Sequence, residues 1–507
     1  MILAQTLGPL EIILVVAYLA VVGYLGWLGY RHTHTATDYM IAGRKAHPFV
    51  MAMSYGATFI STSAVVGFGG VAGLFGMGLL WLTFLNIFAG IFIAMVVLGN
   101  PTRRMGHRLD AHTFPELLGR RFNSRFIQVF AGLIIFVFMP VYAAAVIIGG
   151  TEFITAAFRI DYNVALLVLS AIVAVYVLAG GLKGVMYTDA LQGTIMFLGM
   201  ATLLIGTYVS LGGVVRGHTE LTEMGSQVFA GFRGMGHRGW TSMPEFGWGE
   251  TKYNLWWIVV STMVLGVGIG VLAQPQLVVR FMTVKSKREL NRAVPTGGFF
   301  ILMMTGVAFT VGALSNVYFA QQEEIVCQVV DDAARLDPGP DGKGKLSLVT
   351  ANAPQEVKDR AKRFVSYRLP GAGDEAPLNY ALWTEKTEIV QGEAGGPDIL
   401  KPHLNAVLRS VGLGTTLQGN TDTLIPAYVR SALPHWFGVV FMLTLLSAAM
   451  STMSSQFHTM GTALGRDVFE QYAHHEHGSK SIHVTRFAIV VGIVVALVLG
   501  KYVRGNI

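Results

Sequence analysis

A row of hydroxyl side chains lies inside a long apolar stretch of the sequence, LLSAAMSTMSSQFH. Five hydroxyl residues fall within nine positions, at Ser447, Ser451, Thr452, Ser454 and Ser455. On a helix, positions 447, 451, 454/455 and 458 share one face. Such a face can surround a small cation with neutral oxygens, or its hydroxyls can bond back to the carbonyl four residues earlier and serve packing alone.

The elements that carry this row are predicted to lie in a membrane. The chain has 507 residues, of which 52% are apolar and only 13% charged, against about 25% charged in a soluble protein. Its apolar runs of about 20 residues match a hydrocarbon core of about 30 Å. The composition predicts an all-α polytopic membrane protein. The pI of 9.3 could suggest nucleic-acid binding, but the basic residues flank apolar segments, so we expect no nucleic-acid partner.

We predict ten apolar segments, at residues 9–30, 48–76, 79–100, 126–157, 163–180, 188–212, 254–277, 294–318, 433–464 and 483–501. Lys and Arg gather in the loops after the first, third and seventh segments, at Arg31, Arg44, Lys45, Arg103, Arg104, Arg108, Arg120, Arg121, Arg125, Arg280, Lys285, Lys287, Arg288 and Arg292. These loops share one side, which the positive-inside rule makes cytoplasmic. The sequence therefore predicts a cell (inner) membrane protein with its N-terminus outside.

Residues 320–418 differ from the rest, because they are polar and rich in glycine and proline. They fall on the outer side, and we expect an extracytoplasmic insertion that is partly ordered at best, or alternatively a lid or partner-binding module. The division is then membrane domain 1–319, insertion 320–418 and membrane domain 419–507. The run HHEH at 474–477 resembles a metal cluster, but a solvated loop explains it better.

Two segments are interrupted by small or rigid residues. The second contains VVGFGGVAGLFGMG, and the seventh contains LGVGIGVLAQPQ. Glycine is common in membrane helices for close packing. However, if segments two to six form one five-helix repeat, segment seven opens the next, and paired broken helices at matching positions point to a transporter site. The second repeat then has only four helices before the sequence stops at Ile507.

Six strings carry a resemblance to a known family: DYMIAGRK, SYGATFISTSAVVGFGG, TFPELLGRRFNS, AGGLKGVMYTDALQG, AQPQLVVRFM and SAAMSTMSSQ. The chain resembles the sodium/solute symporter family, which includes sodium-coupled proline, sugar, sialic-acid and monocarboxylate carriers. The family fold is LeuT-like, with two inverted five-helix repeats, broken first helices and one preceding helix. It agrees with the interrupted segments. The resemblance implies a transporter and not an enzyme.

The resemblance also implies ion sites. A first sodium site would use backbone carbonyls of Ala57, Ile60 and Ala448 and the hydroxyls of Ser451 and Thr452. A second sodium site would join one carboxylate to the hydroxyl row, at Asp189, Ser451, Ser454 and Ser455, and Gln192 could orient the carboxylate. Asp189 can equally be a helix N-terminal acid that the helix dipole favours.

For the organic solute, matching family positions imply Ser61 and Tyr142, and Gln274 beside Pro275 could face the cavity. Proline carriers have aromatic residues where this chain has Val267 and Val271, which argues against proline. We therefore expect sodium-coupled import of a small anion such as a monocarboxylate, by alternating access across the lipid bilayer. The alternatives are a proton-coupled symporter of the same fold and a transporter-like sensor domain. The oligomeric state stays open.

Overall fold

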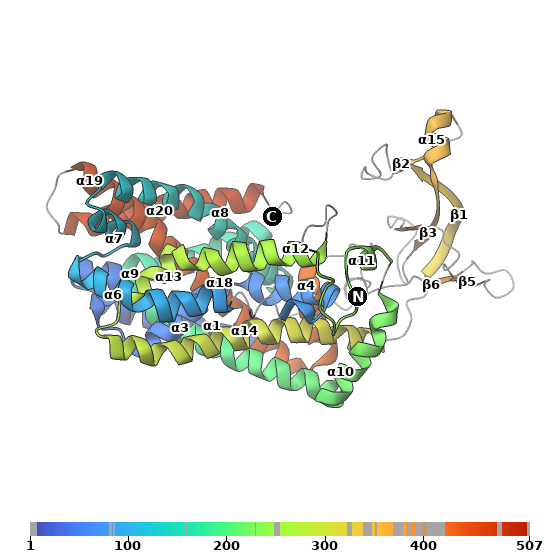
Figure 1. The fold of residues 1–507 in the computed structure, drawn as a ribbon, viewed down its shortest axis with the longest axis horizontal. Helices are drawn as coiled ribbons and strands as arrows, with labels where there is room; N and C mark the ends of the chain where they lie inside the picture. Colours follow the sequence, from blue (N-terminus) through green and yellow to red (C-terminus); the bar gives the residue numbers. More distant parts are fainter. Residues whose placement is uncertain are drawn as a thin grey trace.

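The computed structural model is a bundle of long helices with a small β-sheet at one end (Figure 1). The structure describes residues 8–80, 84, 87–158, 160–228, 230–247, 254–321, 327–337, 347–349, 352–368, 379–382, 388–390, 399–401, 421–473 and 479–503. The histidine run at 474–477 lies outside them. Within the described residues, seven helices are long and apolar enough to cross a membrane, or eight if one bent pair counts as a single span.

The first half of the chain runs through the bundle and ends in short helices beside the sheet. Its elements are α1 (Pro9–Arg31), α2 (Ala36–Ile41), η1 (Ala42–Arg44), α3 (Pro48–Phe59), η2 (Ser63–Gly67), α4 (Phe68–Phe75), η3 (Ile87–Leu98), α6 (Gly99–Arg108), α7 (Phe114–Arg121), α8 (Arg125–Phe158), α9 (Tyr162–Ser210), α10 (Val214–Glu223), η4 (Met224–Gln227) and α11 (Ala230–Gly234). Of these, η2 and η3 are π-helical.

The second half of the chain supplies the remaining helices of the bundle, and the strands of the sheet lie between α14 and α17 in the sequence. Its helices are α12 (Leu255–Val259), η5 (Val260–Ile269), η6 (Gly270–Ala273), α13 (Pro275–Phe281), α14 (Lys287–Ala320), α15 (Gln355–Arg360), η7 (Thr421–Thr423), α17 (Leu424–Ala432), α18 (His435–Thr462), η8 (Ala463–Phe469), α19 (Glu470–Ala473) and α20 (Ser479–Tyr502). Its strands are β1 (Cys327–Asp337), β2 (Ser347–Leu348), β3 (Lys362–Arg368), β4 (Asn379–Leu382), β5 (Glu388–Val390) and β6 (Ile399–Lys401).

Both predicted helix interruptions are present. The pair α3 and η2–α4 bends by 62°, and Ile60 at the end of α3 has an extended backbone, with φ −89° and ψ 104°. In the seventh segment, η6 is followed by Gln274, which is extended with φ −64° and ψ 113°, and Pro275 begins α13. Proline drives the residue before it out of the helical region, which explains this break. Each break leaves carbonyl and N–H groups without a partner in their own helix.

The 49-residue helix α9 contains two of the predicted spans. A straight helix of this length would be about 73 Å long, more than twice the thickness of a hydrocarbon core, but α9 consists of two helices that meet at a kink. Gly181 interrupts its geometry, with φ 55° and ψ −153°. A Cβ atom at Gly181 would lie 2.6 Å from the carbonyl oxygen of Tyr39, so this position requires glycine for space as well as for its dihedral angles.

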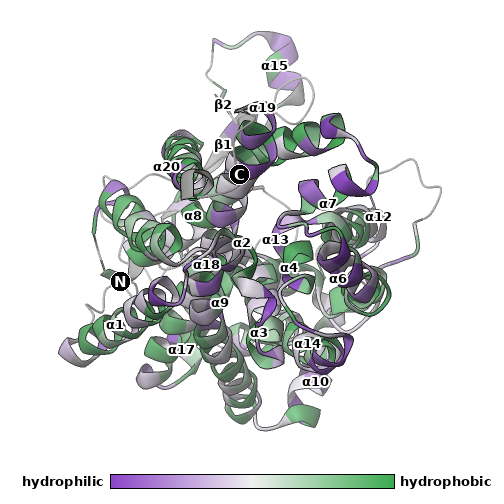
Figure 2. Ribbon diagram, turned by 90° about the vertical axis from the view of Figure 1, so that its left-hand side faces the viewer, coloured by the Kyte–Doolittle hydropathy of each residue, from purple (hydrophilic) through white to green (hydrophobic). Residues whose placement is uncertain are grey.

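The three basic loops lie together at one end of the bundle, as predicted. Arg44 Nη2 contacts Asp110 at 2.7 Å, and Arg103 donates to the carbonyl of Lys285 at 3.2 Å, so the loops contact one another. Figure 1 places α6 and α7 at this end and the N-terminus, α10 and the sheet at the other. Viewed from the basic end, long helices are largely apolar and polar residues gather on α6 and α7 (Figure 2). Arg280 was wrongly assigned to a loop, because it is fully buried in α13.

The polar insertion contains a six-stranded antiparallel sheet in its described residues, with strand order β4-β3-β1-β6-β5 and β2 paired to β1. The strand β3 pairs with β4 in the register Val365 to Ala381. The sequence analysis did not predict this sheet. The sheet stands beside the end that carries α10 (Figure 1).

A buried ionic cluster joins α7 to η8 at the basic end. The Glu116 carboxylate is 2% exposed and lies 2.6 Å from Arg120, 2.9 Å from Arg466 and 2.8 Å from the backbone nitrogen of His112. Burial alone would raise the pKa of the Glu116 carboxyl. The His112 hydrogen bond and the two arginine charges outweigh burial and hold that pKa well below its usual 4.5. The ionised carboxylate therefore stabilises the fold at neutral pH.

Replacing Glu116 with glutamine should destabilise the protein by up to about 3–5 kcal/mol at pH 7, because the buried Arg466 would lose one of its carboxylate partners while keeping Glu470. A carboxyl with a depressed pKa stabilises above its unfolded pKa and loses this effect as pH falls through its folded pKa. The difference between wild type and Glu116→Gln, measured as unfolding midpoints in detergent, should therefore shrink at and below about pH 4.

The matched control for this test is Glu220→Gln on α10. Glu220 also lies 2.6 Å from an arginine, Arg216, but the arginine side chain is 64% exposed. We expect this control to cost less than about 1 kcal/mol. Equal losses for the two variants would contradict the view that burial makes the Glu116 pair important.

Candidate functional site

The hydroxyl row lies on α18, the central helix of the bundle. The helix packs against α9, α8, α3 and α20. Every residue from Thr444 to Thr462 is buried. A helix that is buried on all sides must satisfy its side-chain hydroxyls within the protein. The hydroxyl row therefore meets other polar groups of the bundle rather than lipid.

The first group of predicted residues comes together at the break after α3. The Ser451 hydroxyl donates to the carbonyl of Ala57 at 2.9 Å and lies 3.3 Å from the carbonyl of Ala448. The Thr452 hydroxyl lies 3.3 Å from the carbonyl of Ile60 and 3.2 Å from that of Thr58. All five residues predicted for a first sodium site thus lie in one fully buried group.

The broken helix explains why these carbonyls are available. The last carbonyls of α3 lack the N–H donors of a following turn, because the chain becomes extended at Ile60. Sodium is close in size to calcium, whose oxygen ligands lie at about 2.3–2.6 Å, so adjacent ligands would be about 3.3–3.7 Å apart. The hydroxyl and carbonyl oxygens here are 2.9–3.3 Å apart. These separations are slightly shorter than those expected between sodium ligands.

The second group forms around Asp189 on α9. One carboxylate oxygen accepts from Ser54 at 2.8 Å and from Thr58 at 3.3 Å, and the other lies 3.4 Å from Ser454. The Thr58 and Ser455 hydroxyls are 2.7 Å apart. Three of the residues predicted for a second sodium site, Asp189, Ser454 and Ser455, are therefore neighbours in a fully buried polar group.

This second group also contains a residue that the sequence analysis missed. Arg280 Nη2 lies 2.9 Å from Asp189, and 2.6 Å from each of the Thr58 and Ser455 hydroxyls. Its Nε donates to Ser54 at 2.8 Å. The available signal was the position of Arg280 five residues after Pro275, which places it inside the inner half of the broken helix and not in a loop.

Gln192 has a different partner from the one predicted. It donates to the Tyr18 hydroxyl of α1 at 3.2 Å, and Ser447 donates to the same oxygen at 3.2 Å. Its bond to Tyr18 ties α9 to the preceding helix α1, and we see no hydrogen bond from Gln192 to Asp189 among the described contacts. Ser447, the outermost hydroxyl of the row, accordingly belongs to this contact rather than to either of the two groups described above.

The residues predicted to bind the solute are separate in this structure. Ser61 is 6% exposed and lies at the first break, Tyr142 is 36% exposed on α8, and Gln274 lies at the second break. No hydrogen bond joins these three among the contacts of the described residues. Two buried polar side chains, Thr62 next to Ser61 and Gln456 on α18, have hydroxyl and amide atoms without a hydrogen-bond partner.

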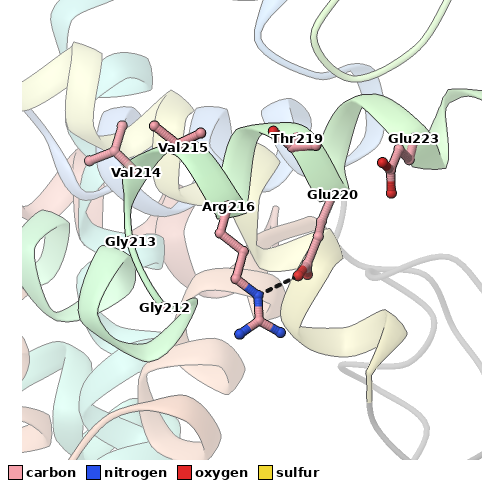
Figure 3. A pocket seen from close by; sticks show the side chains of 8 residues that line it. All are labelled: Gly212, Gly213, Val214, Val215, Arg216, Thr219, Glu220 and Glu223. Atoms are coloured by element: carbon pink, nitrogen blue, oxygen red, sulfur yellow. Dashed lines mark hydrogen bonds and ion pairs between the residues drawn. The ribbon is translucent and has the colours of Figure 1, made fainter.

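A surface pocket lies away from both groups, at the turn between α9 and α10 (Figure 3). It is lined by Gly212, Gly213, Val214, Val215, Arg216, Thr219, Glu220 and Glu223. Arg216 and Glu220 form an ion pair at 2.6 Å within it, so these two charged side chains are already bonded to each other (Figure 3). It shares no residue with the buried groups, so we do not assign the transport site to it.

Comparison with curated proteins finds proline transporters among the relatives. The chain is 29% identical over 290 residues to the osmoregulated proline transporter OpuE of Bacillus subtilis (strain 168), covering 56% of this chain and 54% of that protein. It is 28% identical over 304 residues to the high-affinity proline transporter PutP of the same organism, covering 59% of each. The chain thus matches a little over half the length of these relatives.

A solved structure has the same fold. It is the substrate-bound outward-open state of a Na+-coupled sialic acid symporter, which matches with a TM-score of 0.68 at 15% identity and covers 98% of this chain and 81% of that one. The LeuT-like architecture expected from the broken helices is confirmed by this match. The family model of the sodium:solute symporter family matches residues 39–335 and 404–505. The chain therefore belongs to the sodium:solute symporter family, whose members are membrane transporters.

Proposed function

We propose that this protein couples the movement of sodium to the import of a small organic solute that carries a carboxylate. The observation that supports it most is the contact of Ser451 and Thr452 with the carbonyls of Ala57 and Ile60 at a helix break. Five neutral oxygens, including the Ala448 carbonyl, can replace the water of a monovalent cation without adding a charge to the buried site. Membership of the sodium:solute symporter family agrees with this role.

The solute would bind at the outer side of the ion, where the chain resumes as η2 and α4. Ser61 begins this stretch, and the unpartnered Thr62 hydroxyl lies next to it. The N–H groups at the start of a helix favour a carboxylate. We assign Ser61, Tyr142 and Gln274 to this solute site in a more closed state of the carrier. The relatives transport proline, and Val267 and Val271 favour a monocarboxylate; both solutes carry a carboxylate.

The position of the proposed ion site supports alternating access. It joins the broken span to α18, so sodium binding would hold the two together and inward opening would separate them. We place the basic end in the cytoplasm and the N-terminus outside, in the cell (inner) membrane. The membrane potential then drives sodium inward with about 2.3 kcal/mol per elementary charge per 100 mV.

The test is uptake into proteoliposomes with an imposed inward sodium gradient. Radiolabelled proline, pyruvate, acetate, glucose and pantothenate are compared one at a time, with potassium replacing sodium in the control. We expect sodium-dependent uptake of proline or of one of the monocarboxylates. Sodium-dependent uptake of glucose alone would refute the carboxylate proposal. Uptake that follows a pH gradient without sodium would refute sodium coupling and favour a proton-coupled carrier.

A further inference from the structure

The Arg280 guanidinium is buried at 0% exposure in the polar group around Asp189. It is held by four elements of the bundle. Its own helix is α13, and its partners lie on α9 at Asp189, on α3 at Ser54 and Thr58, and on α18 at Ser455. No flexible loop is involved, so the guanidinium is positioned as firmly as the groups it contacts.

One nitrogen of this guanidinium stands where a cation would be coordinated. Three oxygens converge on Nη2: Asp189 at 2.9 Å, Thr58 at 2.6 Å and Ser455 at 2.6 Å. A carboxylate with hydroxyl oxygens is also the ligand set that a hard monovalent cation prefers. The guanidinium nitrogen and a sodium ion would need the same three oxygens at nearly the same distance, so they cannot be bound there together.

Charge leads to the same conclusion. The group as it stands contains one carboxylate and one guanidinium, so it is neutral. A sodium ion added next to Arg280 would leave an unbalanced positive charge in a site that water does not reach, which is strongly unfavourable. Removal of the guanidinium would leave the Asp189 carboxylate buried and unpaired, which favours binding of a cation in its place.

We propose that Arg280 is a built-in cation that takes the place of a second sodium ion, so that the carrier binds a single sodium at the Ser451–Thr452 group. This inference rests on the proposed sodium coupling and specifies its stoichiometry. It also reassigns Asp189 and Ser455, which hold the arginine instead of an ion, and Ser454, which contacts the Asp189 carboxylate. Arg280 is thus a specificity-determining residue for ion number.

The test counts bound sodium directly and needs no knowledge of the solute. Equilibrium binding of ²²Na⁺ to the purified protein should saturate at about one ion per chain in wild type and at about two in Arg280→Gln, a twofold rise. Arg280→Lys keeps the positive charge and should stay at one. The double variant Arg280→Gln/Asp189→Asn lacks the carboxylate and should return to one.

The outcomes separate this inference from the proposed function. Two ions bound to the wild type would overturn the inference alone, and this measurement decides the question even if Arg280→Gln does not fold. A folded Arg280→Gln that still binds one ion would overturn it as well. A wild type that binds no sodium and shows no sodium-stimulated uptake over the same concentration range would overturn the proposed sodium coupling together with the inference.

Discussion

The double variant Ser451→Ala/Thr452→Val should need at least about tenfold more sodium for half-maximal uptake than the wild type. Both hydroxyls face backbone carbonyls at the break after α3, at 2.9 Å from Ala57 and 3.3 Å from Ile60. Loss of one oxygen that contacts a buried charge costs about 1.5–3 kcal/mol, and each 1.4 kcal/mol is a factor of ten. Valine keeps the shape of threonine, so packing changes little.

Sodium titrations in proteoliposomes measure this shift, and the sodium dependence of the unfolding midpoint measures it without transport. A purely structural role for the hydroxyls predicts a lower midpoint with unchanged sodium dependence. A ligand role predicts that sodium no longer raises the midpoint at concentrations that stabilise the wild type. The two readouts together distinguish lost ligands from lost packing.

The matched control is Thr444→Val, on the same helix and equally buried. The Thr444 hydroxyl donates to the Val440 carbonyl of its own helix at 2.8 Å, so it has no part in the ion group. We expect a sodium requirement within about twofold of wild type. An unchanged requirement in the double variant, or an equal rise in Thr444→Val, would remove Ser451 and Thr452 from the list of ligands.

The break in the second segment and the hydroxyl row could be predicted from the sequence because both are local patterns. Hydroxyls every three or four residues identify one face of a helix, and the glycines and Pro275 identify breaks. The two features meet in the structure as Ser451 with Ala57 and Thr452 with Ile60. That the two features pack against each other could be predicted only from the family resemblance, because no local pattern shows which helices pack together.

The distance of Arg280 from Pro275 indicates a helical position, but no local pattern indicates its partner Asp189. Arg280 follows an apolar run and precedes Lys285, so hydropathy assigns it to the basic loop. In the structure the break at Gln274 shifts the inner half-helix α13 so that Arg280 reaches Asp189, 91 positions earlier in the chain. A charge in a membrane span is recognised as buried only when its partner is known, and that partner is set by tertiary packing.

The sheet in the insertion was missed for a different reason. Its strands are short and separated by glycine- and proline-rich stretches, so low hydropathy outweighed any alternation within them. The pairing is also partly non-local: β1 lies between β3 and β6, so its neighbour β6 starts 62 residues after β1 ends. Long-range pairing of this kind leaves little trace in a window of the sequence.

A single methyl group at Gly312 should strongly destabilise the protein. Gly312 of α14 faces α4, and a Cβ atom there would lie 1.9 Å from the carbonyl oxygen of Gly69. Because this neighbour is backbone, α4 itself would have to move, and overpacking typically costs about 1–3 kcal/mol or more. Alanine is a better helix former than glycine by about 1 kcal/mol, so the packing effect must exceed an opposing gain. We expect Gly312→Ala to lower the unfolding midpoint and the yield of monodisperse protein in detergent.

The same helix offers a control that separates these two effects. Gly306 lies two turns earlier on α14, and a Cβ atom there would meet nothing within 4 Å. Gly306→Ala should therefore keep or raise the midpoint, because only the helix preference changes. Since α4 carries the outer side of the break, Gly312→Ala should also weaken sodium-dependent uptake in the folded fraction. A Gly312→Ala protein as stable and active as Gly306→Ala would show that α4 and α14 do not pack this closely.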